Sequence, residues 1–252
     1  ELATLRANND AMKVYFEFME IKSKMYQGCH HITKDIRSDY EIEFKNVFFR
    51  YPNTEYYVLK NINFKISGKK KTAIVGINGS GKTTIIKLLC RLYDPTEGEI
   101  MLNGINIKEY DYDEYINLFA AVFQDFKLFS FELGQNVAAN TLYNEEFVKE
   151  CLRKSGFSNR PINMAHGLNT ALYKDFEEDG VEVSGGEAQK IAFARALYKN
   201  TPFIVLDEPT AALDPISEYE MYLRFNETVG DKTVIYISHR LSSCRFCDNI
   251  MV

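Results

Sequence analysis

A glycine-rich turn between an apolar run and a helical pattern constrains the fold of this chain most strongly. Residues 76–83 read Gly-Ile-Asn-Gly-Ser-Gly-Lys-Thr and fit the pattern G-x-x-x-x-G-K-[ST]. The apolar run KKTAIVG leads into this turn, and the periodic segment TTIIKLLCRLY follows it. The sequence therefore predicts a strand, a tight loop and a helix in direct succession, which is the setting of a phosphate-binding loop.

The spacing of this loop suits a phosphate group. Glycines let backbone amides turn inward onto phosphate oxygens, and the start of the helix adds its partial positive charge. Lys82 adds a full charge, and the Thr83 hydroxyl is placed to coordinate Mg²⁺. A glycine turn in a surface loop is the less favoured alternative. The residues that we predict to hold the nucleotide here are Gly76, Asn78, Gly79, Ser80, Gly81, Lys82, Thr83 and Thr84.

Two adjacent carboxylates follow another apolar run. Phe203-Ile-Val-Leu ends in Asp207 and Glu208, which places acid at the carboxyl edge of the predicted sheet, beside the phosphate loop. Asp207 could hold Mg²⁺ there, and Glu208 could polarise a water that attacks the γ-phosphate. By itself, an acidic pair after an apolar run is as typical of a solvated strand end as it is of a catalytic site. Together with the phosphate loop, it predicts a site of phosphoryl transfer.

A third glycine motif, Val183-Ser-Gly-Gly-Glu187, opens a predicted helix at Ala188–Tyr198. Ser184, Gly185 and Gly186 with the first helical amides could form a second anion site, which has no lysine to neutralise its ligand. A helix-capping turn is the alternative. One phosphate loop does not need a second anion site in the same chain.

The pattern along the chain predicts an α/β fold. Alternating apolar residues around 42–49 and 62–66 favour an antiparallel sheet, whereas FIVLD and KTVIYIS are buried strands that alternate with helices and favour a mainly parallel sheet. Residues 130–182 have helical patterning without a buried-strand signal. We therefore expect a helical subdomain over about residues 128–198.

The first residues differ from the rest. Residues 8–26 place Met12, Tyr15, Phe16 and Met19 on one stripe at helical spacing, and the aperiodic segment after them indicates a linker. We place the domain boundary near residue 38, with one domain over residues 39–252.

Charge and cysteine content narrow the class of protein. Thirty Lys and Arg against 35 Asp and Glu give a net charge of −5, so we expect no nucleic-acid partner. The five cysteines are an odd number in a chain too long to need disulfides, which favours free thiols on the cytosolic side. No run approaches the about 18 apolar residues of a membrane span, so we expect this chain by itself to be soluble.

The motifs and their order along the chain resemble those of the nucleotide-binding domain of ATP-binding cassette (ABC) transporters. The resemblance covers nearly the whole chain from about residue 40 onward. The resemblance implies an ABC ATPase fold: a P-loop NTPase core with a mainly parallel sheet, an antiparallel β-subdomain and a helical subdomain. It also implies ATP and Mg²⁺. VSGGE resembles the family signature LSGGQ, with Val183 in place of Leu and Glu187 in place of Gln.

Four further roles come only from this resemblance. Tyr51 in Phe49-Arg-Tyr-Pro looks like the platform on which adenine stacks, and Gln124 looks like the glutamine that touches Mg²⁺ or the attacking water. Asp214, in a segment that resembles the loop after the acidic pair, is expected to help bind the nucleotide, and His239 in YISHR looks like the switch histidine at the γ-phosphate. With Lys82 and Glu208, we expect Gln124 and His239 to serve catalysis.

The resemblance also implies partners. ATP on one subunit would be closed over by Ser184 and Gly186 of a second nucleotide-binding domain, in a head-to-tail homo- or heterodimer. Residues 8–26 look like the cytosolic extension of the last membrane helix of an exporter, and Glu178-Asp-Gly180 partly matches the exporter loop before the signature. These features imply an ATPase at the cytoplasmic face of a membrane that powers export, joined to a transmembrane domain on the same full-length chain, with the family's C-terminal elements missing. The alternatives are an importer subunit, a non-transport ABC ATPase and a regulatory cassette that does not hydrolyse ATP.

Overall fold

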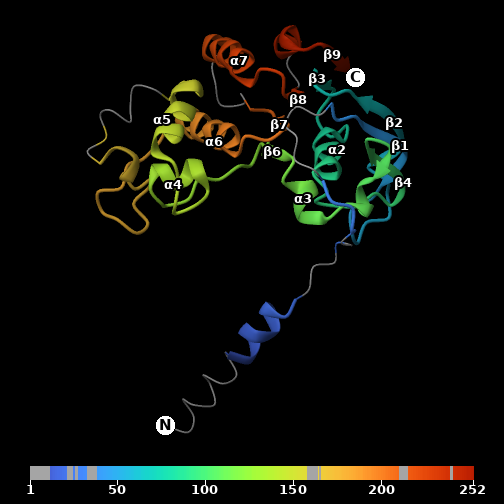
Figure 1. Ribbon diagram of the computed structural model, residues 1–252, viewed down its shortest axis with the longest axis horizontal. Coiled ribbons are helices and arrows are strands. Elements are labelled where there is room, and N and C mark those ends of the chain that lie inside the picture. Colours follow the sequence, from blue (N-terminus) through green and yellow to red (C-terminus); the bar gives the residue numbers. More distant parts are fainter. Residues whose placement is uncertain are drawn as a thin grey trace.

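The computed structural model describes residues 12–21, 25, 28–32, 39–157, 164, 166–209, 215–238 and 241–252. Within them, two sheets lie next to one another, and a group of helices lies at the far end from the antiparallel sheet (Figure 1).

The smaller sheet is antiparallel and has the order β2-β1-β4-β5. Its central strand β1 pairs antiparallel with β2 on one side and β4 on the other. The alternation read from the sequence is present, since Ile42, Phe44, Val47 and Phe49 are buried. The strands are β1 (Ile42–Phe49), β2 (Leu59–Ile66), β4 (Glu97–Leu102) and β5 (Ile105–Asn106). The predicted antiparallel sheet is confirmed.

The larger sheet is parallel throughout and has the order β6-β7-β8-β3-β9. Both of its faces are buried: in β7, Phe203 and Val205 face one hydrophobic cluster, and Ile204 and Leu206 face the other. The strands are β3 (Lys71–Val75), β6 (Phe119–Val122), β7 (Phe203–Asp207), β8 (Thr233–Ser238) and β9 (Asn249–Met251). A parallel sheet covered on both faces is the signature of an α/β fold, so this prediction is confirmed.

Helices pack around the two sheets (Figure 1). The α-helices are α2 (Lys82–Leu89), α3 (Tyr112–Ile116), α4 (Leu133–Ala138), α5 (Glu145–Lys154), α6 (Gly185–Lys199) and α7 (Pro215–Val229). The 3₁₀ turns are η1 (Ile107–Glu109), η3 (Gly167–Asn169) and η4 (Leu241–Phe246). Helices α4 and α5 both pack on α6. In the described part of residues 130–182, strand pairing is limited to isolated bridges, in line with the helical patterning.

Helix α2 ends earlier than its sequence pattern indicates. The periodic run continues to Tyr93, but the helix stops at Leu89, and Arg91 takes a φ of 51°. The Arg91 side chain is fully buried, where Nη1 donates to the Ile107 carbonyl at 3.1 Å and Nε lies 3.3 Å from the Asp94 carboxylate. A buried guanidinium needs such partners. The helix ends in a local C-cap, in which the Arg91 amide donates to the Leu88 carbonyl at 3.0 Å and the Leu92 amide donates to the Lys87 carbonyl at 2.8 Å.

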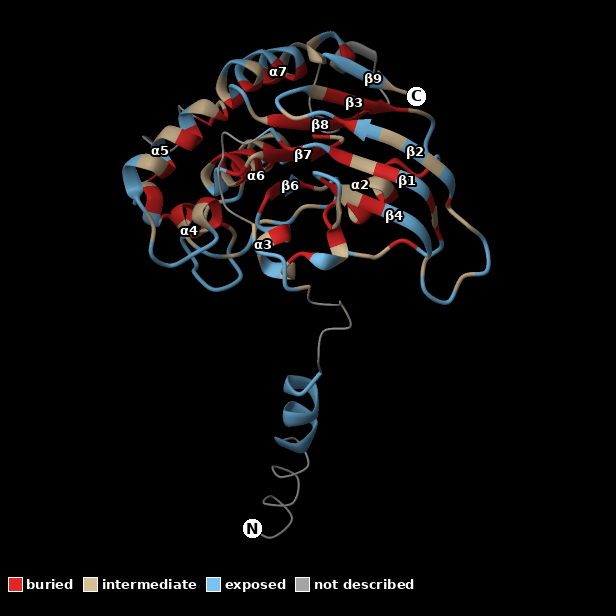
Figure 2. Cartoon of the chain, turned by 45° about the vertical axis from the view of Figure 1, so that its right-hand side comes forward, coloured by how far each residue is buried: buried red, intermediate tan, exposed pale blue. Residues whose placement is uncertain are grey.

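Residues 12–19 form a helix whose side chains are all exposed (Figure 2). The predicted stripe is exposed along its length, with Met12 at 55% and Met19 at 62%. Val14 and Phe18, which lie off that stripe, are exposed as well. None of the helices in the described residues has both the length and the apolar character needed to cross a bilayer.

Candidate functional site

The phosphate loop lies where its sequence predicts, between β3 and α2. Gly79 and Gly81 have φ values of 81° and 94°, a region that L-residues rarely adopt. At Gly81, which caps α2, a Cβ atom would also lie 2.6 Å from Leu59 Cδ2. Glycine is therefore favoured here by the backbone conformation, and any larger residue would also have to displace the Leu59 side chain.

Lys82 is held inside this loop. Its side chain is largely buried, and Nζ donates to the carbonyl oxygens of Gly76 and Ile77, both at 2.9 Å. These two carbonyls partly replace the water that the ammonium lost on burial. The charge is thereby placed at the phosphate loop rather than in solvent.

Asp207 meets the phosphate loop from the end of β7. Thr83 Oγ1 donates to Asp207 Oδ2 at 2.8 Å, and Asp207 is 1% exposed. Burial is the main cause that raises the pKa of this carboxyl group, and the charges of Glu208 and Asp125 add to the increase, against the Thr83 hydrogen bond and Lys82. The other oxygen, Oδ1, is buried and has no hydrogen-bond partner.

A hydroxyl and a carboxylate with an unsatisfied oxygen fit Mg²⁺, which prefers oxygen ligands. Among the described residues, no group of three or more His, Cys, Asp or Glu side chains is arranged to hold a metal ion. Two protein oxygens suit Mg²⁺ in this setting, because this ion commonly completes its shell with water and substrate phosphates.

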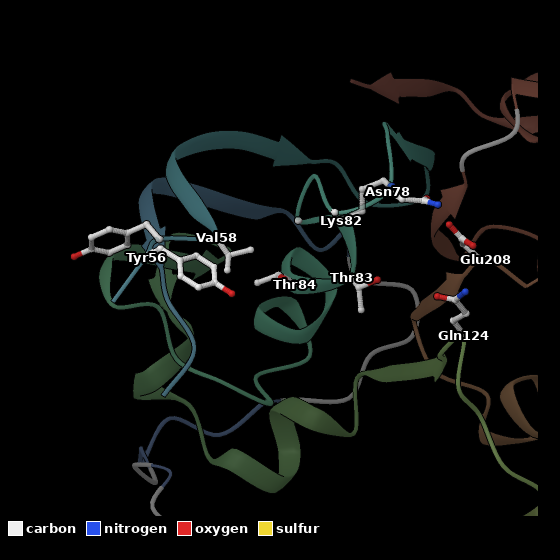
Figure 3. Close-up of a pocket in the computed structure, with 11 residues that line it drawn as sticks. Tyr56, Val58, Asn78, Lys82, Thr83, Thr84, Gln124 and Glu208 are labelled. Atoms are coloured by element: carbon white, nitrogen blue, oxygen red, sulfur yellow. The ribbon is translucent and has the colours of Figure 1, made fainter. Parts of the chain in front are cut away.

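One cavity of about 590 Å³ gathers most of the predicted phosphate-loop residues together with Gln124 and Glu208 (Figure 3). Its lining residues are Tyr56, Tyr57, Val58, Asn78, Gly79, Gly81, Lys82, Thr83, Thr84, Gln124 and Glu208. In Figure 3 the side chains of Asn78, Gln124 and Glu208 converge at one end, next to Thr83. The cavity thus joins Lys82 and Thr83 of the phosphate loop to Gln124 and Glu208, and its volume is in the usual range for small-molecule sites, while Asp207 contacts it through Thr83.

Glu208 adopts an unusual backbone conformation. Its φ is 48°, which is uncommon for a residue other than glycine, asparagine or aspartate, and its amide donates to the Ile237 carbonyl at 3.0 Å. Strand β8 therefore holds the turn that directs this side chain into the cavity. Such strain is often found at functional positions.

Tyr51 lies beside this cavity and is not among its lining residues. The Tyr51 hydroxyl is 3.0 Å from Thr84 Oγ1, which does line it. The ring packs edge-on against Phe49 and Tyr93, with centroid distances of 5.0 and 5.4 Å. The aromatic side chains in the lining are instead Tyr56 and Tyr57, which the sequence analysis missed. In the sequence, the one indication of their role is that they directly precede β2, whose first residue, Leu59, lies close to Gly81 of the phosphate loop.

Ser184 begins α6 in a capping box with Glu187. Neither Ser184 nor its two glycines lines the phosphate-loop cavity. Gly185 lines a neighbouring cavity that also includes Gln124 and Gln189. The structure therefore does not bring the second anion motif into the first site of the same chain. Asp214 and His239 lie outside the described residues.

Comparison with known proteins agrees with this geometry. The family described as ABC transporter matches residues 59–211. The subtilin transport ATP-binding protein SpaT of Bacillus subtilis is 40% identical over 248 residues, which are 97% of this chain and 40% of that protein. The ATP-dependent lipid A-core flippase of Escherichia coli (strain K12) is 39% identical over 244 residues, 96% of this chain and 41% of that protein.

A solved structure of a bacterial Atm1-family ABC exporter with ATP bound superimposes with a TM-score of 0.84 at 28% identity, over 99% of this chain and 43% of that chain. The chain thus spans about two fifths of the length of the curated relatives named here. The match to the family covers more than half of the chain, including the phosphate loop and the acidic pair. We conclude that the chain is a nucleotide-binding member of the ABC transporter family and has its ATPase fold.

Proposed function

We propose that this chain is the ATPase module of an ABC exporter, which binds ATP with Mg²⁺ and hydrolyses it to power export of a substrate. The observation that carries the proposal is the single cavity in which Lys82, Thr83, Gln124 and Glu208 meet, with Asp207 bonded to Thr83. The names of the similar proteins, a lipid A-core flippase, a subtilin transport ATP-binding protein and an Atm1-family ABC exporter, support export rather than import. The direct test is phosphate release from MgATP by the purified chain.

Each side chain has a role that follows from its place. Lys82 would turn from the Gly76 and Ile77 carbonyls to the phosphates, since an anion is a stronger partner than two neutral carbonyls. Thr83 and Asp207 would hold Mg²⁺, which neutralises charge on the phosphates when it is bound. Glu208 would orient the attacking water and accept its proton, and Gln124 would help to position that water. On the resemblance alone, Asp214 is proposed to help bind the nucleotide, and His239 is proposed to act at the γ-phosphate.

The second anion motif supports a head-to-tail pair of such modules. Ser184 and its glycines do not line the cavity of their own chain, so a nucleotide-bound partner would supply their phosphate. Closure of the pair on ATP and reopening after hydrolysis would move a transmembrane domain. Residues 1–38 are proposed as the connection to that domain, residues 39–252 as the nucleotide-binding domain, and the cytoplasmic face of the membrane as their location.

We expect association to depend on ATP. In a Glu208→Gln background, which slows hydrolysis, sedimentation should show a monomer without nucleotide and a detectable dimer with MgATP. Ser184→Arg should abolish the dimer because its bulk blocks the second anion site, while ATP affinity in the monomer is unchanged. Undiminished ATP-dependent association of the Ser184→Arg protein would refute the composite site.

The proposed adenine platform has its own test. Tyr51→Ala should weaken ATP binding by about 1 to 3 kcal/mol, as loss of a stacked base typically does, with turnover at saturation nearly constant. Tyr51→Phe keeps the ring and removes only the Thr84 contact, so it should bind ATP nearly as the parent does. Tyr56→Ala is the comparison variant, because Tyr56 lines the cavity and is 68% exposed. If Tyr56→Ala loses affinity and Tyr51→Ala does not, the base stacks on the other ring.

A further inference from the structure

The Ser184 hydroxyl is engaged by an acidic side chain of its own helix. Ser184 Oγ donates to Glu187 Oε2 at 2.8 Å, and the Ser184 amide donates to the same oxygen at 2.8 Å. In return, the Glu187 amide donates to Ser184 Oγ at 3.4 Å. A hydroxyl has one proton to donate. Here that proton points to a carboxylate.

This contact opposes the role that the proposed function gives to Ser184. To bind a phosphate of the second copy, the hydroxyl must withdraw its proton from Glu187 and donate it to the phosphate. The Glu187 carboxylate then loses the hydroxyl as a hydrogen-bond donor and lies next to the negatively charged phosphate. Repulsion between these two anions makes dimer closure less favourable. Ser184 is exposed and Glu187 is half-buried, so water and salt screen this repulsion only in part.

We propose that Glu187 is a positioning residue that limits the strength of ATP-dependent closure by holding the Ser184 hydroxyl. The inference rests on the proposed function, because it concerns the same contact between copies. Glu187 should therefore change the affinity between the two copies in the dimer, and it should not change the affinity of one chain for ATP. Glu187 is absent from the lining of the phosphate-loop cavity, as this separation requires.

Glutamine is the substitution that isolates the charge. A capping box accepts either Glu or Gln at this position, so Glu187→Gln keeps an acceptor for the Ser184 amide and preserves the start of α6. The neutral amide is a weaker acceptor for the hydroxyl and does not repel a phosphate. Glu182→Gln is the matched control, since Glu182 is an exposed acid two residues before Ser184 and its loss changes the net charge equally.

The experiment measures the dimer dissociation constant by sedimentation in MgATP and in MgADP, with every protein in the Glu208→Gln background. Glu187→Gln should lower that constant about tenfold in MgATP, the equivalent of one charge-assisted hydrogen bond released. In MgADP, which lacks the γ-phosphate, it should cause no gain. Glu182→Gln should match the parent in both nucleotides. The thermal midpoints without nucleotide should agree, because the helix cap is retained.

Different outcomes test the role of Glu187 and the proposed ATP-dependent dimer separately. If the parent associates with MgATP and Glu187→Gln does not strengthen that association, the inference alone is overturned. A gain of equal size in MgADP or in Glu182→Gln would also overturn it, since the effect would then be one of net charge. If none of the proteins associates with MgATP, the composite site fails and the inference fails with it.

Discussion

Glu208→Gln should reduce ATP hydrolysis by about 10²-fold or more while leaving ATP affinity nearly unchanged. Glu208 lines the cavity one residue after Asp207, and the amide of glutamine has the same shape but cannot accept a proton from water. Removing a general base lowers kcat, whereas the phosphate contacts of Lys82 and Thr83 remain. Phosphate release under saturating MgATP, together with equilibrium titration of ATP, measures both quantities.

A matched substitution controls for the loss of one negative charge. Glu99 is exposed on β4 and lies outside the cavity, so Glu99→Gln should hydrolyse ATP at the parent rate. Full turnover in Glu208→Gln would show that another group activates the water. A parallel loss of ATP affinity would instead place Glu208 among the binding residues.

Lys82→Ala should weaken ATP binding by about 2 kcal/mol or more, which is roughly 30-fold, because a charge-assisted contact to phosphate is lost. The substitution also leaves the Gly76 and Ile77 carbonyls without their ammonium partner. Anion binding then depends on the loop amides and on the N-terminus of α2 alone. Titration of the purified protein with ATP at constant salt measures the loss.

A fold control is needed because Lys82 is largely buried. The thermal midpoint of Lys82→Ala without nucleotide shows whether the protein is folded, and Lys149→Ala, at an exposed position on α5, removes an equal charge away from the cavity. We expect Lys149→Ala to bind ATP as the parent does. Equal ATP affinity in a folded Lys82→Ala protein would contradict the assignment of Lys82 as the main phosphate contact.

Most of the fold could be predicted because its signals are local. The apolar runs of β3, β7 and β8 have the length and composition of buried parallel strands, and the alternation in β1 marks a strand of the antiparallel sheet. The strands β4, β5, β9 and β6 were not predicted, and in β6 the four apolar residues FAAV do not distinguish a strand from a helix. Strand β6 forms because β7 offers a parallel partner.

The sequence by itself determined the phosphate loop, since the left-handed glycines and the helix start that build it are neighbours in the chain. Only the tertiary structure decided what meets this loop. Asp207 reaches Thr83 across 124 positions, because parallel strands bring their carboxyl ends to one edge of the sheet. Likewise, the fold buries Arg91 against the Ile107 carbonyl just after α2, and packing of Tyr51 against Phe49 and Tyr93 left it outside the cavity lining. Local spacing specifies backbone conformation, whereas contacts between distant side chains depend on how the sheets and helices pack, which no single segment encodes.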